Sequence, residues 1–272
     1  MIINGKKIEP NADLTFADLS SAKMNMAMLT GARLIGANLN KSELRFAKLG
    51  KAILNTANFE YADMSGCDVQ KADVRSALGE GVVLIGSTLN ETKMILADLR
   101  NGTLSNASFF QSDLRGINLS GANLLSAGLS GARLDFADIS QANLDKCDFS
   151  QANLTGAQMI HSSARWSHWD DTTLNLADLS FSNFYDSKFP RVSCFQTNFM
   201  SCNMTLADLT DANLTNANFT AACLQRAVLT NANLEGANVS RANLIEAKIT
   251  FEQLSYAANL TGTIMPDGTV HR

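Results

Sequence analysis

The sequence predicts an all-β solenoid, and two observations support this fold class. From Leu14 to Leu254 every fifth residue is large and apolar with three exceptions, which are Gly79, Ala164 and Cys194. A small residue, most often alanine, stands two positions before each of them, and no insertion or deletion breaks the phase. A period of five cannot follow one face of an α-helix, because the apolar stripe would rotate around the axis. The repeat therefore predicts short extended segments that alternate with corners.

Each repeat is expected to place two side chains inside the solenoid. The small and the large residue point inward and the residue between them points outward, as in a β-strand. The next two residues break this alternation and form the corner. Small residues are needed because side chains from several walls converge on a narrow interior. Representative core residues predicted in this way are Leu14, Leu39, Phe149, Trp169, Phe189 and Leu214.

The repeat resembles that of the pentapeptide-repeat family. The family's A(D/N)LXX unit is visible as Ala37-Asn38-Leu39, Ala137-Asp138-Ile139 and Ala232-Asn233-Leu234. The resemblance implies a right-handed quadrilateral β-helix with four repeats in each coil of twenty residues. About twelve coils, stacked about 4.8 Å apart, would form a rod of roughly 58 Å and a single domain.

Both ends of the chain are expected to cover the exposed edges of the outermost coils. Residues 1–11 are predicted to form an N-terminal cap with a hairpin at Asn4-Gly5, and residues 12–249 to form the β-helix. Residues 250–272 form the C-terminal cap, in which Thr250-Phe251-Glu252-Gln253 reads as the capping box of a short helix. The tail that follows resembles closing segments of bacterial members of the family, which implies a bacterial protein.

Composition argues against several classes of function. The chain has 22 basic and 26 acidic residues, a mild net charge of −4, which does not suggest direct binding to nucleic acid. No apolar run is long enough to span a membrane and no signal peptide is recognisable, so we expect a soluble protein without a membrane partner. The five cysteines lack CxxC spacing, which indicates free thiols and a cytoplasmic location.

No motif predicts catalysis, a cofactor or a metal site. The three histidines, His161, His168 and His271, do not pair with each other or with cysteine at the spacing of metal ligands. The glycines fall mostly at corners and form no phosphate-binding loop. We therefore expect a protein that is not an enzyme and that takes no cofactor.

Residues 160–200 are the one break in composition, because they are rich in aromatic residues. Trp169, Phe184, Phe189 and Phe199 fall on inward positions, whereas Trp166, Phe181, Tyr185, Phe195 and Met200 fall on outward corners. Outward aromatic residues on consecutive coils are candidate anchors for a partner. The alternative is that they pack against neighbouring coils, as Phe16, Phe46 and Phe136 would. The candidate partner-binding residues are His161, Trp166, Phe181, Tyr185, Phe195 and Met200.

Three functions remain open. The preferred one is a scaffold that binds an unidentified protein partner through its outer walls. Some members of the family mimic DNA and bind type II topoisomerases, namely gyrase or topoisomerase IV. A DNA mimic of this length would need roughly 34 negative charges at one charge per ~1.7 Å, whereas the net charge of this chain is only −4, which weakens this alternative. The third is a bacterial effector delivered to another cell, and a homodimer through the capped ends is a further expectation.

The substitution Leu214→Asp tests the predicted register. An unpaired carboxylate in the interior should destabilise the fold by more than about 4 kcal/mol and abolish its cooperative thermal transition, which circular dichroism measures. Asn213→Asp, at the adjacent outward position, should leave Tm nearly unchanged. A Leu214→Asp protein that melts like the wild type would contradict the register.

Overall fold

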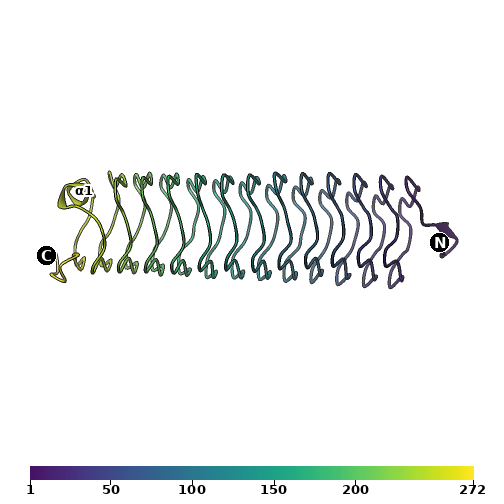
Figure 1. Ribbon diagram of the computed structural model, residues 1–272, viewed down its shortest axis with the longest axis horizontal. Helices are drawn as coiled ribbons and strands as arrows, with labels where there is room; N and C mark the ends of the chain where they lie inside the picture. The colour runs from purple at the N-terminus through teal and green to yellow at the C-terminus, as the bar shows by residue number, and fades with distance from the viewer. The chain divides into compact units, whose positions relative to one another are not determined.

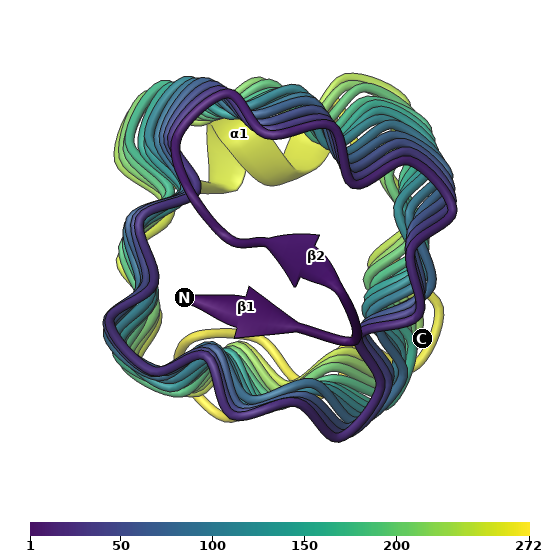
Figure 2. The same ribbon diagram turned by 90° about the vertical axis from the view of Figure 1, so that its right-hand side faces the viewer.

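The computed structural model describes all 272 residues, which form two compact units, Met1–Asp138 and Ile139–Arg272. Both units are stacks of similar coils (Figure 1). In the first unit Asp13 pairs in parallel with Arg33, twenty residues later, and in the second unit Ser163 pairs with Asn183 in the same way. Each coil therefore holds four repeats and has four walls, which the end-on view shows as a square outline (Figure 2). Each wall contributes one bridging residue rather than a long strand.

The corners have an unusual backbone conformation that repeats without exception. Every fifth residue from Asn11 to Glu246 has a φ between +53° and +70°. At one such corner the Ala17 amide donates to the Leu14 carbonyl at 3.0 Å, which closes a turn around Phe16. A positive φ at the third residue is the mark of a type II turn. The conformation costs a residue other than glycine roughly 1–2 kcal/mol. The Phe16 amide in return donates to the Ile35 carbonyl of the next coil at 2.9 Å.

The interior is filled by the large residues of the repeat. The six predicted core residues are all buried, with at most 1% of their surface exposed. The rings of Phe149, Trp169 and Phe189 stack in one column, with centroid distances of 4.2 and 5.4 Å. Phe184 meets Trp169 edge-on at 6.0 Å, and the small Ala164 lies in the coil below Phe184. Size compensation of this kind keeps the interior closely packed.

Buried hydroxyl groups occupy many of the small inward positions, and each finds a backbone acceptor. Ser182 Oγ donates to the Met159 carbonyl at 2.6 Å, and Thr197 Oγ1 donates to the Leu174 carbonyl at 2.7 Å. Both acceptors belong to the large residue of the preceding coil. A buried hydroxyl without a partner would be costly, so these bonds explain why serine and threonine replace alanine here.

A short hairpin precedes the first coil. Strand β1 (Ile2–Ile3) pairs antiparallel with β2 (Lys6–Lys7), and the turn residues Asn4 and Gly5 both have positive φ. This combination is typical of a type I′ turn. Both strands cross the mouth of the first coil (Figure 2), and the Asn4 side-chain amide donates to the Asp18 carbonyl at 3.0 Å. The hairpin is thereby attached to the coil that it covers.

The helix α1 (Phe251–Ser255) interrupts the last coils of the second unit. Thr250 caps it in a capping box with Gln253, and the pairing distance lengthens by one residue, so that Asn238 pairs with Asn259. In addition, the Gln253 amide donates to the Leu229 carbonyl at 2.7 Å and to the Ala232 carbonyl at 2.9 Å. A side chain thus supplies the hydrogen bond that a backbone N–H supplies in the regular coils.

Gly79 occupies an inward position at which the repeat normally has a large residue. Phe59 of the preceding coil explains this exception. A β-carbon at Gly79 would overlap with the ring of Phe59 and lie 2.7 Å from Leu99 Cδ2. The aromatic ring therefore fills the space that a leucine would occupy in the regular repeat.

This size compensation predicts a coupling between two substitutions. Gly79→Ala should destabilise the protein by about 1–3 kcal/mol through overpacking, and Phe59→Leu by about 1 kcal/mol through a cavity. The double variant should lose at least about 0.5 kcal/mol less than the sum. Urea denaturation measures all three, and strictly additive effects would show that the two residues do not share the space.

Candidate functional site

The aromatic-rich segment lies in the second unit, and its six candidate residues are all outside the core. His161, Trp166, Phe181 and Phe195 are exposed, whereas Tyr185 and Met200 are half-buried. The exposed fraction is 40% for Trp166, 47% for Phe181 and 38% for Phe195. Exposure of this extent leaves each ring partly available to a partner.

The six residues line two adjacent walls rather than one patch. We call the wall that bridges through Gln158, Asp178 and Asn198 the Asp178 wall, and the wall that bridges through Ser163, Asn183 and Asn203 the Asn183 wall. The corner that the two walls share holds His161 and Phe181, whose rings stack at 5.0 Å.

The other four candidates lie at the edges of these walls. Trp166 and Tyr185 meet edge-on at 6.2 Å at the far edge of the Asn183 wall. Phe195 lies at the far edge of the Asp178 wall, and Met200 beside the shared corner. The candidates therefore spread over three corners, because a step of five residues advances the chain by one wall.

Two cations flank the ring of Trp166. Arg165 Cζ is 4.9 Å from its centroid and Lys146 Nζ is 6.0 Å away. Arg165 is in turn held by Asp145, whose carboxylate accepts hydrogen bonds from Nε at 3.0 Å and from a terminal nitrogen at 2.5 Å. Cation–π contact of this kind attracts the cations to the face of the indole.

Asp145 is the anchor of this cluster. Its side chain is only 5% exposed and also accepts hydrogen bonds from Ser163 Oγ at 2.6 Å and from the Arg165 amide at 2.9 Å. Burial raises the pKa of the Asp145 carboxyl, but the hydrogen bonds from Arg165 and Ser163 outweigh burial, so that its pKa lies below the usual value. The carboxylate stays charged at neutral pH and fixes the arginine against the indole.

The Asp178 wall is bordered by apolar side chains on both edges. Sequence reasoning missed Ile160 and the 56% exposed Leu176, although their phase already marked them as outward. Between the edges, Asn198 Nδ2 donates to Asp178 at 2.9 Å and Asn218 Nδ2 donates to Asn198 at 2.9 Å. The segments 156–161, 176–181 and 196–201 contain no lysine or arginine. The surface of this wall therefore has apolar edges and, between them, a row of hydrogen-bonded asparagine and aspartate side chains.

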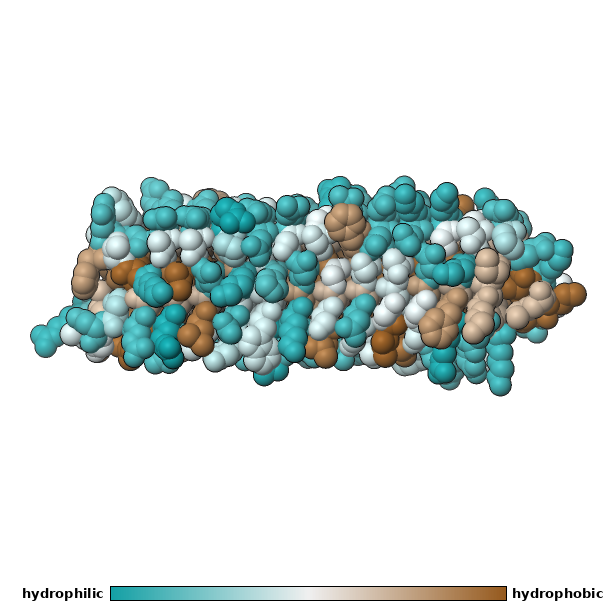
Figure 3. Space-filling model, viewed as in Figure 1, coloured by the Kyte–Doolittle hydropathy of each residue, from teal (hydrophilic) through white to brown (hydrophobic).

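Exposed aromatic residues of the first unit lie differently. A β-carbon added to Gly36 or Gly66 would lie 2.6 or 2.5 Å from the ring of Phe16 or Phe46 in the preceding coil. Each of these rings leans on a glycine of the next coil and so has a packing contact on one side, although more than half of the residue stays exposed. Trp166 and Phe181 have Asp186 and Ser201 at the equivalent positions. On the face drawn in Figure 3, apolar side chains occur singly or in small groups among hydrophilic ones.

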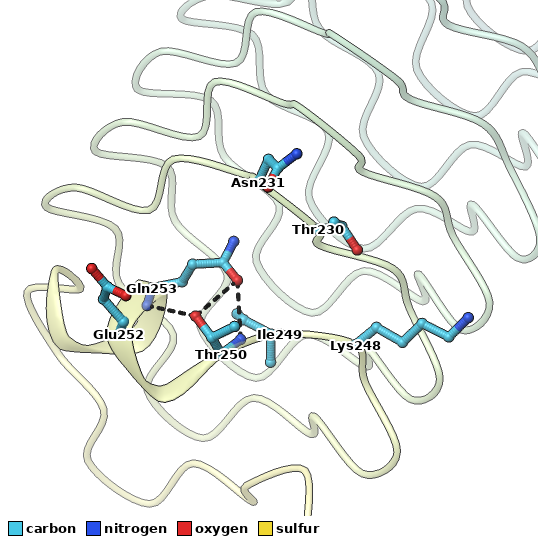
Figure 4. A pocket seen from close by; sticks show the side chains of 7 residues that line it. All are labelled: Thr230, Asn231, Lys248, Ile249, Thr250, Glu252 and Gln253. Carbon is cyan, nitrogen blue, oxygen red and sulfur yellow. Dashed lines mark hydrogen bonds between the residues drawn. The ribbon is translucent and has the colours of Figure 1, made fainter.

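A notch of about 460 Å³ lies beside α1, where the chain leaves the regular coil (Figure 4). Its best-placed polar groups are already used, because Thr250 and Gln253 bond to each other in the capping box. Lys248 extends away from Gln253 in the same view. The notch is explained by the start of the helix, and its groups do not converge on a common point as in a catalytic site.

Burial makes three of the five cysteines poor nucleophiles. Burial raises the pKa of the Cys67 and Cys202 thiols to about 12 and that of Cys194 further. Such thiols are protonated and poor nucleophiles at neutral pH. No group of three or more His, Cys, Asp or Glu side chains is placed to hold a metal ion.

None of the helices has the length and apolar character that crossing a bilayer requires.

Asp145→Asn tests the anchor of the Trp166 cluster. Because the folded-state pKa of Asp145 is lowered, its contribution to stability is complete above the ordinary carboxyl pKa and is lost as the pH falls through the folded value. The variant should therefore be clearly less stable than the wild type at pH 7, and the difference should shrink below about pH 4. Denaturant titrations between these pH values measure it.

Asp171→Asn is the matched control, since Asp171 pairs with Arg191 in an exposed ion pair. Exposed pairs contribute little, so its effect should be small at both pH values. Equal effects of the two substitutions would contradict the role assigned to Asp145.

Comparison with known proteins agrees with the architecture. The family described as pentapeptide repeats matches in eight copies, at residues 12–45, 37–75, 62–101, 80–116, 103–135, 132–168, 192–220 and 222–255. No curated protein matches the chain.

Three solved structures illustrate the likeness. HetL, a pentapeptide repeat protein involved in heterocyst differentiation regulation in the cyanobacterium Nostoc sp. strain PCC 7120, is 27% identical; the match covers 88% of this chain and 92% of HetL, with a TM-score of 0.41. Rfr23 from the cyanobacterium Cyanothece 51142 is 32% identical over 31% of this chain and 58% of its own, with a TM-score of 0.31. A trypsin-treated variant of QnrB1, a plasmid-mediated fluoroquinolone resistance protein, is 15% identical over 82% and 92%, with a TM-score of 0.34.

All three TM-scores lie below 0.5. The family match covers most of the coils described above, and it agrees with their period of five and with the twenty-residue pairing. The chain belongs to the pentapeptide-repeat family and has that family's right-handed β-helical fold.

Proposed function

We propose that this protein is a non-catalytic scaffold that binds a protein partner through the Asp178 wall and the Asn183 wall. The observation that carries the proposal is the set of exposed aromatic residues in the second unit that do not lean on a glycine. Phe181 and Trp166 lie at opposite edges of the Asn183 wall, and Phe195 borders the Asp178 wall. Partly exposed tryptophan, tyrosine and phenylalanine are typical anchors of protein interfaces.

The backbone holds these anchors at fixed positions. Phe181 and Trp166 both occupy corners with positive φ, and each corner amide bonds to the coil that follows, as Trp166 does to the Tyr185 carbonyl at 3.0 Å. A partner would therefore meet a surface that is already ordered. Preorganisation reduces the entropic cost of binding.

A role as a DNA mimic receives less support. Acidic residues of both units serve local turns, because Asp98 in the first unit accepts the Arg100 amide at 3.2 Å and Asp178 in the second accepts the Ser180 amide at 3.0 Å. Asp98 also forms an ion pair with Arg100 at 2.8 Å, which offsets the negative charge of Asp98. At one charge per ~1.7 Å, a DNA duplex as long as the expected rod of roughly 58 Å would carry roughly 34 negative charges, whereas this chain has a net charge of −4.

The proposal also includes the location of the protein, the number of its coils and the role of its two ends. We place the scaffold in the cytoplasm on the basis of its free cysteines, which suit a reducing compartment. The repeats would form about twelve coils, with β1–β2 as the N-terminal cap and α1 with the tail as the C-terminal cap.

Crosslinked capture from bacterial lysate tests the proposal. The wild type should retain a protein that mass spectrometry identifies, and Trp166→Ala/Tyr185→Ala or Phe181→Ser/Phe195→Ser should reduce capture by about tenfold or more, as loss of anchors worth about 2 kcal/mol implies. The thermal transition should remain close to that of the wild type.

Phe16→Ser/Tyr61→Ser is the matched control, because both rings are exposed but lean on Gly36 and Gly81. Capture should survive in this variant. If all three double variants retain the same protein equally, the two walls are not the binding surface. Capture of a topoisomerase subunit would favour the DNA-mimic function instead.

A further inference from the structure

The first unit carries an apolar group on a different corner. Met26 and Phe46 occupy successive positions of one corner, with exposed fractions of 70% and 58%, and Met28 lies two residues further on the next wall with 53%. The coils are joined here by hydrogen bonds, since the Met26 amide donates to the Arg45 carbonyl at 2.7 Å. Three large side chains that are each more than half exposed therefore lie on one corner and the wall that follows it, and we call this group the Met26 patch.

Basic residues surround the Met26 patch. Within residues 22–51, the two walls that meet at this corner and their outer corners hold Lys23, Lys41, Arg45, Lys48 and Lys51. The same segment holds one carboxylate on these walls, Glu43, and it accepts a hydrogen bond from the Asn25 amide at 3.2 Å.

The next coil neutralises only part of this charge. Asp63 pairs with Arg45 at 2.5 Å and Asp68 approaches Lys48 at 3.9 Å. Lys23 and Lys51 have no such partner among the ion pairs of the structure. Residues 1–51 hold eight lysines and arginines against four carboxylates, although the chain as a whole is acidic. The Met26 patch is therefore apolar at its centre and basic around it.

We propose that the Met26 patch docks on the surface of an anionic lipid membrane. Apolar side chains that enter the headgroup region, combined with lysines that contact anionic headgroups, are the two signals that hold a peripheral protein on a bilayer. The patch sits on a convex corner, which reaches into a planar interface but offers no groove to a peptide or small molecule. From the sequence we expected no membrane partner; we depart from that expectation because the twenty-residue pairing places Met26, Phe46 and the lysines on one corner and the walls beside it.

Vesicle flotation with the full-length chain tests the proposal. Vesicles of phosphatidylcholine with about one third phosphatidylglycerol should carry the protein, and pure phosphatidylcholine vesicles should carry at least about tenfold less. Met26→Ser/Phe46→Ser and, separately, Lys23→Gln/Lys48→Gln/Lys51→Gln should each lower binding by about tenfold or more. Binding should also fall at high salt, which screens the lysines.

The control variant is Phe16→Ser. Its ring is exposed to 77% and leans on a glycine of the next coil, as Phe46 does, but it lies on the opposite corner of the coil. It should bind the anionic vesicles like the wild type, and all variants should keep the wild-type Tm. The proposal is overturned if the wild type does not float with anionic vesicles, if it binds neutral vesicles equally well, or if the control loses binding as Met26→Ser/Phe46→Ser does.

Discussion

The hydrogen bond between residues one coil apart is the interaction on which the rest of this structure depends. Each wall holds only one bridging residue, so no wall has a strand long enough to be stable alone. Order comes from stacking: Arg33 donates to Ala12 in the coil before it, and Leu34 donates to Ile53 in the coil after it. The positive φ of every corner is tolerated because these bonds act at each step along the stack.

The same constraint explains how side chains are chosen on the two sides of the wall. Inside, a large residue must fit its neighbours one coil away, so Phe59 accompanies Gly79 and Trp169 stacks between Phe149 and Phe189. On the outside, side chains need not fit a neighbour one coil away in the same manner, and charged, amide and aromatic residues vary from coil to coil. Differences in function among such walls therefore reside in outward residues that leave the fold unchanged.

Much of the fold could be predicted because its signal repeats. The period of five identifies inward residues such as Leu214 and Phe199, and the alanine two residues before each of them indicates the narrow interior. The corner conformation was harder to predict, because glycine marks only some corners and bulky residues such as Leu96 and Leu176 adopt the same positive φ. Sequence propensity favours glycine there, and the stacking bonds override it.

The candidate site was predictable only in part. Phase placed Trp166 and Phe181 outward, but the walls to which they belong follow from the twenty-residue pairing. The burial of Asp145 could not be inferred, since an outward position is normally exposed; it becomes buried because Arg165 and Ser163 of the next coil close over it. Contacts between residues twenty positions apart leave no local pattern that a reading of short motifs would detect.

The lengthened pairing at α1 shows what a change in chain length does to this architecture. One extra residue between Asn238 and Asn259 coincides with the end of the regular corners, and the Gln253 side chain has to replace a backbone donor. An insertion or deletion of one residue inside the repeats would break the pairing between adjacent coils at that point unless a corner absorbed it, whereas the residues beyond it would keep their own repeat. A gain or loss of twenty residues would instead add or remove a whole coil and preserve every type of contact. Relatives of this chain should therefore differ in length by complete turns, as a repeat array grows by duplication of its structural unit.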